Sequence, residues 1–466
     1  MTHIIGPFDG RKARRKRCNR CVERRIKCIG GIPCENCRRT SYNCRLPAKK
    51  ELATPVFVHR TQAGFARTAI PQRKNTAVSL PHQVASTPSD VYLEYFFSHF
   101  LYQNAFTSIS PQFANSVITL LHSSSELHNA VEAISALHIS QSTSFLQEKD
   151  DPAALQAYSR SVRSLQTKLE SESATRDPSV LWATLLLGVF ELMRDPTGTN
   201  WLTHFLHGTS TMLRLLGPSV LISHSGENTH RQAFFFSARI FELSRALIYT
   251  EHTFLATTQW TTAIEAYWAV NPRLRTPKEA LLDMVPLFAS LGIRVLHFIS
   301  LAGSPALYRR ACAARTLAQE GLALQQRLQQ WVFRSSNIPS STDASASAPD
   351  EDALIARAYY HALSIYLDGI FSYHPPFTTP PAPQSPTLNP PTIQNHLACI
   401  LSTCHQLLER RCAGLVLFFP LRVAGARARD LHSRSEIMRL LGLIAQRGFS
   451  VAASFIGDLE GLWARS

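Results

Sequence analysis

Several features that define common classes of protein are absent from this 466-residue chain. No stretch approaches the roughly 18 uncharged apolar residues of a membrane span, and residues 1–17 lack the apolar core of a secretory signal. The catalytic signatures G-x-x-x-x-G-K-[ST], H-E-x-x-H, G-x-S-x-G and G-x-G-x-x-G do not occur either. The sequence therefore predicts an intracellular, soluble protein that does not contact a membrane and is not an enzyme.

Acidic residues are scarce at the N-terminal end of the chain, where the basic residues are concentrated. Residues 1–50 contain 15 Lys and Arg but only Asp9, Glu23 and Glu35 as acids, which gives this segment a net charge of +12. The whole chain carries +15, so the remaining residues are close to neutral. Positive charge of this density is typical of a surface that binds a polyanion such as nucleic acid. No acidic block resembles an activation tail, which leaves activation and repression both open.

The cysteines are distributed as unevenly as the charge. Six of the ten follow the pattern C-x2-C-x6-C-x5-C-x2-C-x6-C, as Cys18, Cys21, Cys28, Cys34, Cys37 and Cys44. In a reducing compartment, such a cluster indicates a metal site rather than disulfides. Structural zinc takes four ligands, so six thiolates either share two sulfurs between two zinc ions or bind one metal. The remaining four lie in apolar helical sequence and are predicted to be buried thiols: Cys312, Cys399, Cys404 and Cys412.

The cysteine spacing and the basic first repeat resemble the fungal Zn(2)-Cys(6) binuclear cluster transcription factors. The resemblance implies a zinc-dependent, sequence-specific regulator of RNA polymerase II genes that binds double-stranded DNA in the nucleus. It also implies two zinc ions per chain, with Cys18 and Cys34 bridging the metals and the other four cysteines as terminal ligands. A module this small has almost no apolar core, so we expect zinc binding to stabilise its fold. We assign residues 11–46 to this module.

The basic residues around the cluster predict how DNA is contacted. Arg24 and Arg25 are expected to read guanine edges in the major groove, and the resemblance implies a CGG-type triplet, although Val22 stands where the family most often has Arg. Arg38 and Arg39 are predicted to clamp the phosphate backbone. The basic run 11–17 is also typical of a nuclear localisation signal. The full predicted DNA-contacting set is Arg14, Arg15, Lys16, Arg17, Arg20, Arg24, Arg25, Lys27, Arg38 and Arg39.

Residues 47–89 are predicted to form a flexible linker, because they are rich in Pro, Thr, Ala and Gln and have little periodicity. The segment has no sustained heptad of apolar residues, so it gives no support for dimerisation through a leucine zipper. The oligomeric state and the spacing of DNA half-sites therefore remain open.

Residues 90–466 are predicted to form a large all-α domain of about a dozen helices, since period-two alternation is scarce. Asp151-Pro152 and Asp177-Pro178 are typical helix starts. The first opens a helix whose apolar face is Leu155, Tyr158, Val162, Leu165 and Leu169. The second precedes residues 180–193, which are apolar on every side and therefore predicted to be central. A third helix is expected over residues 200–216 and ends at Gly217-Pro218.

Two interruptions, residues 335–350 and 374–392, are predicted to be exposed loops, the second partly polyproline II because it holds eight prolines. His204 and His207 are expected to be hydrogen-bonded helical residues rather than metal ligands.

Two blocks, residues 201–213 and 419–425, resemble parts of the fungal-specific transcription factor domain. The resemblance implies a regulatory domain that acts with the transcription machinery or co-regulators, and by analogy a regulator of a secondary-metabolite gene cluster. The alternative hypothesis is a helical co-regulator or scaffold whose zinc module binds protein or RNA. Pull-downs with and without nuclease distinguish the two.

Overall fold

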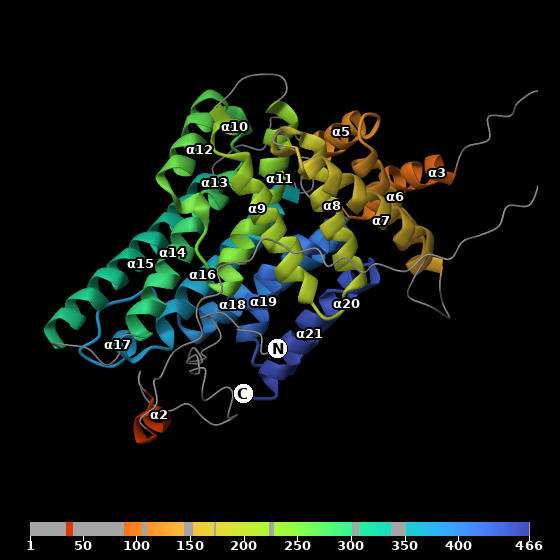
Figure 1. Ribbon diagram of the computed structural model, residues 1–466. Coiled ribbons are helices and arrows are strands. Elements are labelled where there is room, and N and C mark those ends of the chain that lie inside the picture. Colours follow the sequence, from red (N-terminus) through yellow and green to blue (C-terminus); the bar gives the residue numbers. More distant parts are fainter. Residues whose placement is uncertain are drawn as a thin grey trace, which may run out of the picture. The chain divides into compact units, whose positions relative to one another are not determined.

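The computed structural model describes residues 34–40, 88–104, 110–143, 152–171, 174–222, 228–300, 307–336 and 351–465. The chain divides into two compact units, one spanning Lys12–Ala85 and the other combining Met1–Arg11 with Ser86–Ser466. Every regular element within the described ranges is a helix, which confirms the mainly α fold (Figure 1). The segment predicted to be a linker lies outside the described residues up to position 87.

The smaller unit contributes one described helix, α2 (Glu35–Arg39), and the larger unit contributes the others. In the described parts of the larger unit they outnumber the predicted dozen, because several are single turns that a sequence pattern does not separate from their neighbours. They are α3 (Pro88–Tyr95), the π-helix η2 (Phe96–Phe100), α4 (Leu101–Gln103), α5 (Ser110–Leu121), α6 (Ser125–Thr143), α7 (Pro152–Leu169), η3 (Ala174–Arg176), α8 (Pro178–Arg194), the π-helix η4 (Trp201–Leu206), α9 (His207–Leu216), α10 (Ser219–Ile222), α11 (Asn228–Tyr249), η5 (Phe254–Ala256), α12 (Thr258–Val270), η6 (Pro272–Leu274), α13 (Pro277–Leu282), α14 (Val285–Ser300), α15 (Leu307–Ser336), α16 (Glu351–Ser372), α17 (Pro375–Thr378), α18 (Pro390–Glu409), η7 (Gly414–Leu417), α19 (Phe418–Arg427), α20 (Leu431–Gln446) and α21 (Ala452–Trp463).

Helix α8 is a central element of the larger unit, as its composition predicted. Asp177 begins the helix, since its carboxylate accepts a hydrogen bond of 2.8 Å from the backbone N–H of Ser179. Twelve of its residues are buried, and the helix packs against α6, α7, α9 and α11. The ring of Trp182 meets that of Phe234 on α11 edge to face at 5.3 Å.

Helix α7 buries a slightly different face from the one predicted. Of the predicted apolar face, Leu165 is buried, Leu155, Tyr158 and Val162 are partly buried against the core, and Leu169 is 37% exposed. The most buried positions carry small residues, namely Ala154, Ala157 and Ser161, together with Leu165. Small side chains let the backbones of α6 and α7 approach closely, and the Ser161 hydroxyl donates to the Glu126 carbonyl at 2.6 Å.

The helix predicted over residues 200–216 begins with the π-helix η4 and continues as α9. It ends where predicted, because Gly217 adopts a φ of +73°, a conformation that residues with a Cβ rarely adopt. The indole of Trp201 on η4 packs edge to face against Phe418 at 5.2 Å, next to the second block that resembles the fungal domain. The two blocks that carry the resemblance are therefore neighbours in the core.

The proline-rich segment 374–392 is only partly the exposed loop that was predicted. Its first prolines form the one-turn helix α17, and its last two begin α18, where Asn389 caps the N-terminus. Between them Pro386 is buried, and the backbone N–H of Leu388 donates to the Asp368 carboxylate at 2.8 Å. Proline suits both helix starts because its missing N–H has no intrahelical partner there.

Two other expectations are corrected in the C-terminal half of the chain. Helix α15 continues to Ser336, past the predicted loop start at residue 335, and residues 337–350 lie outside the described part. Cys404 and Cys412 are buried as predicted and Cys399 is partly buried, whereas Cys312 is exposed. The prediction was wrong for Cys312 because residues 311–313 all lie on the outward face of α15.

Within the described residues, one helical stretch, Pro277–Ser300, is long and apolar enough to cross a membrane by length and composition. This differs from the expectation drawn from the sequence. The stretch comprises α13 and α14, which pack against α11, α15 and α16, and 44% of its most apolar window is buried. A core helix passes the same test, so the stretch is weak evidence for a membrane span.

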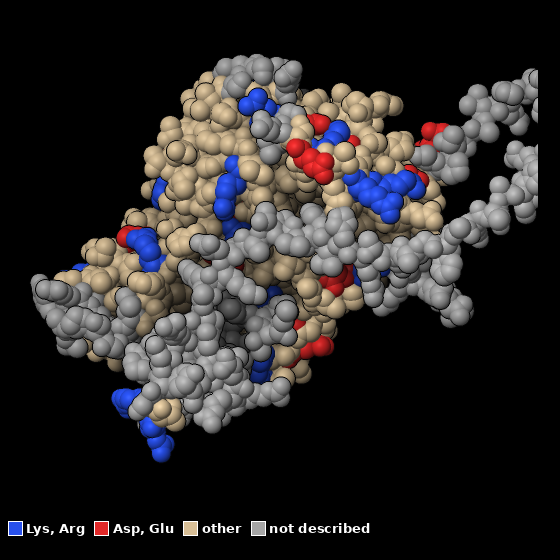
Figure 2. All heavy atoms as spheres, viewed as in Figure 1, with Lys and Arg blue, Asp and Glu red and all other residues tan. Residues whose placement is uncertain are grey.

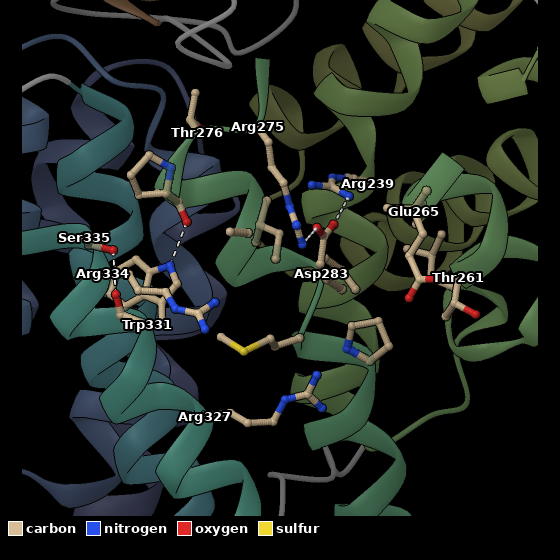
Figure 3. A pocket seen from close by; sticks show the side chains of 18 of the residues that line it. Arg239, Thr261, Glu265, Arg275, Thr276, Asp283, Arg327, Trp331, Arg334 and Ser335 are labelled. Carbon is tan, nitrogen blue, oxygen red and sulfur yellow. Dashed lines mark hydrogen bonds and ion pairs between the residues drawn. The ribbon is translucent and has the colours of Figure 1, made fainter. Parts of the chain in front are cut away.

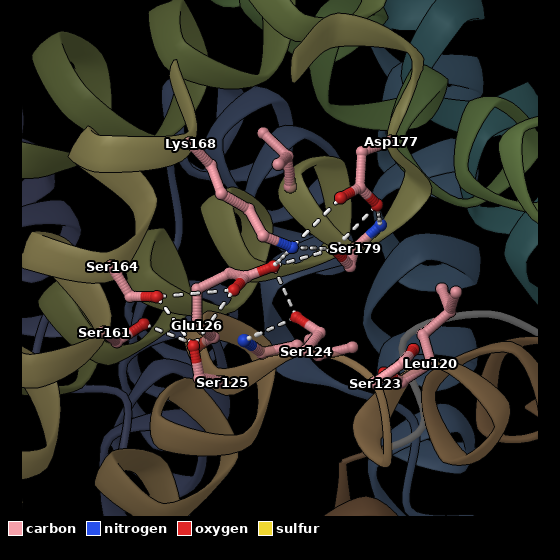
Figure 4. A network of polar contacts seen from close by, with 12 residues as sticks. Leu120, Ser123, Ser124, Ser125, Glu126, Ser161, Ser164, Lys168, Asp177 and Ser179 are labelled. Atoms are coloured by element: carbon pink, nitrogen blue, oxygen red, sulfur yellow. Dashed lines mark hydrogen bonds and ion pairs between the residues drawn. The ribbon is translucent and has the colours of Figure 1, made fainter. Parts of the chain in front are cut away.

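A buried carboxylate, Glu126, ties three helix ends together (Figure 4). Its side chain is fully buried at the start of α6 and accepts hydrogen bonds from Lys168 at 2.5 Å and Ser179 at 2.8 Å. Lys168 lies at the end of α7 and also pairs with Asp177, the N-cap of α8, at 3.0 Å. Burial alone would raise the pKa of Glu126, but these hydrogen bonds outweigh it and hold the pKa below its ordinary 4.5.

We expect Glu126→Gln to lower the free energy of unfolding by about 1–3 kcal/mol at neutral pH, because Lys168 loses its buried charged partner. A carboxylate whose pKa is depressed by folding stabilises the protein above its ordinary pKa and loses this contribution as the pH falls through the lowered value. The difference in the free energy of unfolding between the unaltered chain and Glu126→Gln should therefore shrink below about pH 4.5. Urea unfolding across this range measures it, with the exposed Glu460→Gln as control. A difference that does not change with pH would contradict this account.

Candidate metal centre and nucleic-acid interface

The described part of the predicted zinc module contains two of its six candidate ligands, Cys34 and Cys37. Cys34 is the N-cap of α2 and has an extended backbone, while Cys37 lies within the helix. Their exposed fractions are 0% and 1%. The other four candidate ligands lie outside the described residues: Cys18, Cys21, Cys28 and Cys44.

Local hydrogen bonds explain why this segment forms a helical turn. The backbone N–H of Arg38 donates to the carbonyl of Cys34 at 2.9 Å, which closes the first turn. The Thr40 hydroxyl donates to the carbonyl of Cys37 at 3.4 Å near the helix end. Residues three apart lie on one face of a helix, so the turn places both cysteines on the same side. Two buried cysteines on one side of a turn can supply two of the four ligands that a structural zinc ion takes, so these residues fit the metal.

The charged side chains of α2 are exposed, and its cysteines are buried. Arg38 and Arg39 occupy its last turn and are both exposed, whereas the two cysteines are buried. Exposed guanidinium groups next to a cysteine turn are available to phosphates. The remaining predicted DNA contacts lie outside the described residues: Arg14, Arg15, Lys16, Arg17, Arg20, Arg24, Arg25 and Lys27.

The larger unit shows no comparable metal site where the structure describes it. No group of three or more His, Cys, Asp or Glu side chains that could hold a metal occurs among the described residues. His204 is hydrogen-bonded as predicted, with its Nδ1 atom 2.6 Å from the Glu191 carboxylate. Burial lowers the pKa of His207 on the next turn. On the uncovered part of the face shown in Figure 2, the described Lys and Arg form separate groups, several of them beside Asp or Glu.

Sequence reasoning missed a cavity between α11, α12, α13, α14 and α15, which is lined by four arginines. Two signals were available. Beyond Arg231 near its start, helix α11 carries three more charged residues in an apolar sequence, Arg239, Glu242 and Arg245, and such residues need partners when buried. The segment from Thr276 to Glu279 also has the spacing of a capping box, and the Thr276 hydroxyl accepts from the Glu279 N–H.

Two known protein families match separate parts of the chain. The Fungal Zn(2)-Cys(6) binuclear cluster domain matches residues 16–52, and the Fungal specific transcription factor domain matches residues 91–466. No curated protein and no solved structure matched the chain. The first of these domains binds two zinc ions and DNA, and proteins of these families are transcription factors rather than enzymes. The chain therefore belongs to the fungal-specific transcription factor domain family and is a zinc-dependent, DNA-binding transcription factor of the Zn(2)-Cys(6) type.

Proposed function

We propose that the chain recognises a CGG-type triplet through its N-terminal module and regulates RNA polymerase II genes in the nucleus. The observation that carries this proposal is the arrangement on α2, where two buried cysteines stand beside two exposed arginines. The module extends over residues 11–46 in this proposal, residues 47–89 link it, and residues 90–466 form the regulatory domain.

Six cysteines hold the two zinc ions in the proposed module. Four-coordinate zinc with six sulfurs requires two of them to bridge, and the family pattern assigns the bridges to Cys18 and Cys34. Each sulfur bound to zinc is a thiolate, so the cluster carries a net negative charge that the neighbouring arginines and lysines offset. Bound zinc supplies the fold of the module, and the chain's own basic residues supply its contacts to DNA.

In this proposal the module makes two kinds of contact with DNA, to the bases and to the phosphates. Arg24 and Arg25 present planar guanidinium groups to the O6 and N7 atoms of guanine, which gives base specificity. Arg38, Arg39 and the basic run 11–17 neutralise phosphates, which gives salt-dependent affinity without sequence information. The same basic run serves nuclear import when DNA is not bound.

We expect Arg24→Ala and Arg25→Ala each to weaken binding to the preferred site by about 1–3 kcal/mol and to relax sequence choice at one position. Arg38→Ala should weaken binding to all DNA sequences alike, because it removes a phosphate contact. It should also lower the slope of the logarithm of the binding constant against the logarithm of the salt concentration by about one unit. Selection from random DNA, followed by titration at several salt concentrations, measures both effects. Arg315→Ala, on the exposed face of α15, is the control.

A selection that enriches no triplet with the full chain would reject the proposed base readout. The target genes form a separate proposal, that the factor controls a secondary-metabolite gene cluster. Mapping chromatin occupancy tests it directly, since binding would concentrate at the promoters of such a cluster.

A further inference from the structure

The arginine cavity, defined by Arg239, Arg275, Arg327 and Arg334, has a volume of about 340 Å³ (Figure 3). This places it at the lower end of the range for pockets that bind small molecules. Its walls come from α11 to α15, all within the larger unit. The Trp331 indole on α15 donates to the Pro277 carbonyl at 2.9 Å, which fixes α15 against the start of α13.

Two of the four arginines already have ionic partners. Arg239 is 1% exposed and pairs with Asp283 at 3.0 Å and with Glu279. Arg275 pairs with the other oxygen of Asp283, also at 3.0 Å. Both oxygens of Asp283 are thus engaged, and neither arginine needs a ligand to balance its charge.

The other two arginines are both exposed, so water solvates their charges in the absence of a ligand. Arg327 and Arg334 lie seven residues apart on α15 with Trp331 between them, so all three share one face of the helix. Neither guanidinium group makes an ion pair or a hydrogen bond with another described residue. Figure 3 shows both side chains extending from α15 into the cavity, with Glu265 and Thr261 across it on α12.

Apolar side chains make up much of the remaining wall. Leu243, Leu255, Ile264, Met284 and Pro286 line the cavity together with the face of Trp331. An apolar body fits such a wall, and a guanidinium group binds a carboxylate with charge-assisted hydrogen bonds. Inorganic anions would leave the apolar wall uncovered, and a neutral apolar molecule would leave the arginines unused.

We propose that the arginine cavity is a binding site for a small amphipathic carboxylate, held by Arg327 and Arg334 at its charged end. Glu265 opposes the ligand's charge from the far wall and therefore limits its affinity. The site is independent of the proposed recognition of DNA, because all its residues belong to the helical domain.

The test uses the full chain and octanoate as the probe, with binding measured by calorimetry. We expect octanoate to bind and octanol to bind at least tenfold more weakly, because octanol has the same body without the charge. The double variant R327M/R334M should weaken octanoate binding by roughly tenfold or more. Glu265→Gln should strengthen it by about twofold, because it removes a like charge at a distance. Ala280→Phe, which fills the cavity, should abolish it.

The matched control is Arg315→Met, which removes the same charge from an exposed position on the same helix outside the cavity. Octanoate binding should not change in this variant. Equal binding of octanol and octanoate, equal weakening by Arg315→Met, or full competition by inorganic phosphate would each overturn the proposal. Absence of octanoate binding to the unaltered chain would also overturn it.

Discussion

Replacing Cys34 with serine is expected to abolish sequence-specific DNA binding and to leave the helical domain folded. The hydroxyl of serine is a poor zinc ligand, and in the proposed module Cys34 would bridge the two metals. Loss of a bridge removes a ligand from both zinc ions at once. The zinc content of the purified full chain should therefore fall from two ions to one or none.

The expected size of the effect follows from the way such modules fold. Zinc binding contributes on the order of 10 kcal/mol to small structural zinc modules, far more than their few apolar residues supply. The affinity for the preferred DNA site should accordingly fall by at least about 1,000-fold, or roughly 4 kcal/mol. The far-UV circular dichroism should stay strongly helical, because the cysteine belongs to the smaller compact unit.

Cys312→Ser is the matched control for this experiment. Its thiol is exposed on α15 in the larger unit, so the same chemical change removes no predicted ligand. Zinc content and DNA affinity should both equal those of the unaltered chain. Two zinc ions and unchanged DNA binding in Cys34→Ser would show that the predicted cluster is wrong.

Local signals in the sequence were sufficient to predict part of the fold. Asp177-Pro178 begins α8 and Gly217 ends α9, because capping depends on residues that are adjacent in the chain. The central place of α8 followed from its apolar composition alone. The cysteine pattern by itself likewise indicates the family, since the spacing of metal ligands is a local property of the sequence.

Features that depend on partners distant in the sequence could not be predicted. The pairing of Arg239 with Glu279 joins α11 to α13, and its buried geometry is set by packing rather than by spacing. The predicted face of α7 does pack against the core, but the most buried positions beside it carry small residues, which close contact with α6 favours. The charged residues of α11 indicated buried ion pairs, but the arginine cavity was missed because the packing of α11 to α15 around it does not follow from the spacing of residues.

A large loss of stability is also expected when the buried carboxylate of Glu279 is replaced. Its side chain is 4% exposed and faces both Arg239 and Lys278. Burial alone would raise the pKa of Glu279, but these two cations outweigh it and lower the pKa. Glu279→Gln should lower the free energy of unfolding by about 3–5 kcal/mol, because it leaves a buried guanidinium with one carboxylate instead of two. Chemical unfolding followed by circular dichroism measures it.

Two further variants separate the charge effect from a simple loss of packing. Replacing both partners, as R239M/E279M, should cost less than Glu279→Gln alone, because the buried guanidinium is removed together with its carboxylate. Lys278 keeps Asp352 and Asp283 keeps Arg275 as partners. Glu320→Gln breaks an exposed Arg–Glu pair with Arg294, between α14 and α15, and should cost only about 0–1 kcal/mol. If Glu279→Gln and Glu320→Gln lowered the free energy of unfolding equally, water would have to reach Arg239 in solution. The guanidinium group would then be stable without a carboxylate partner, and α11 and α13 would not form a closed wall of the arginine cavity.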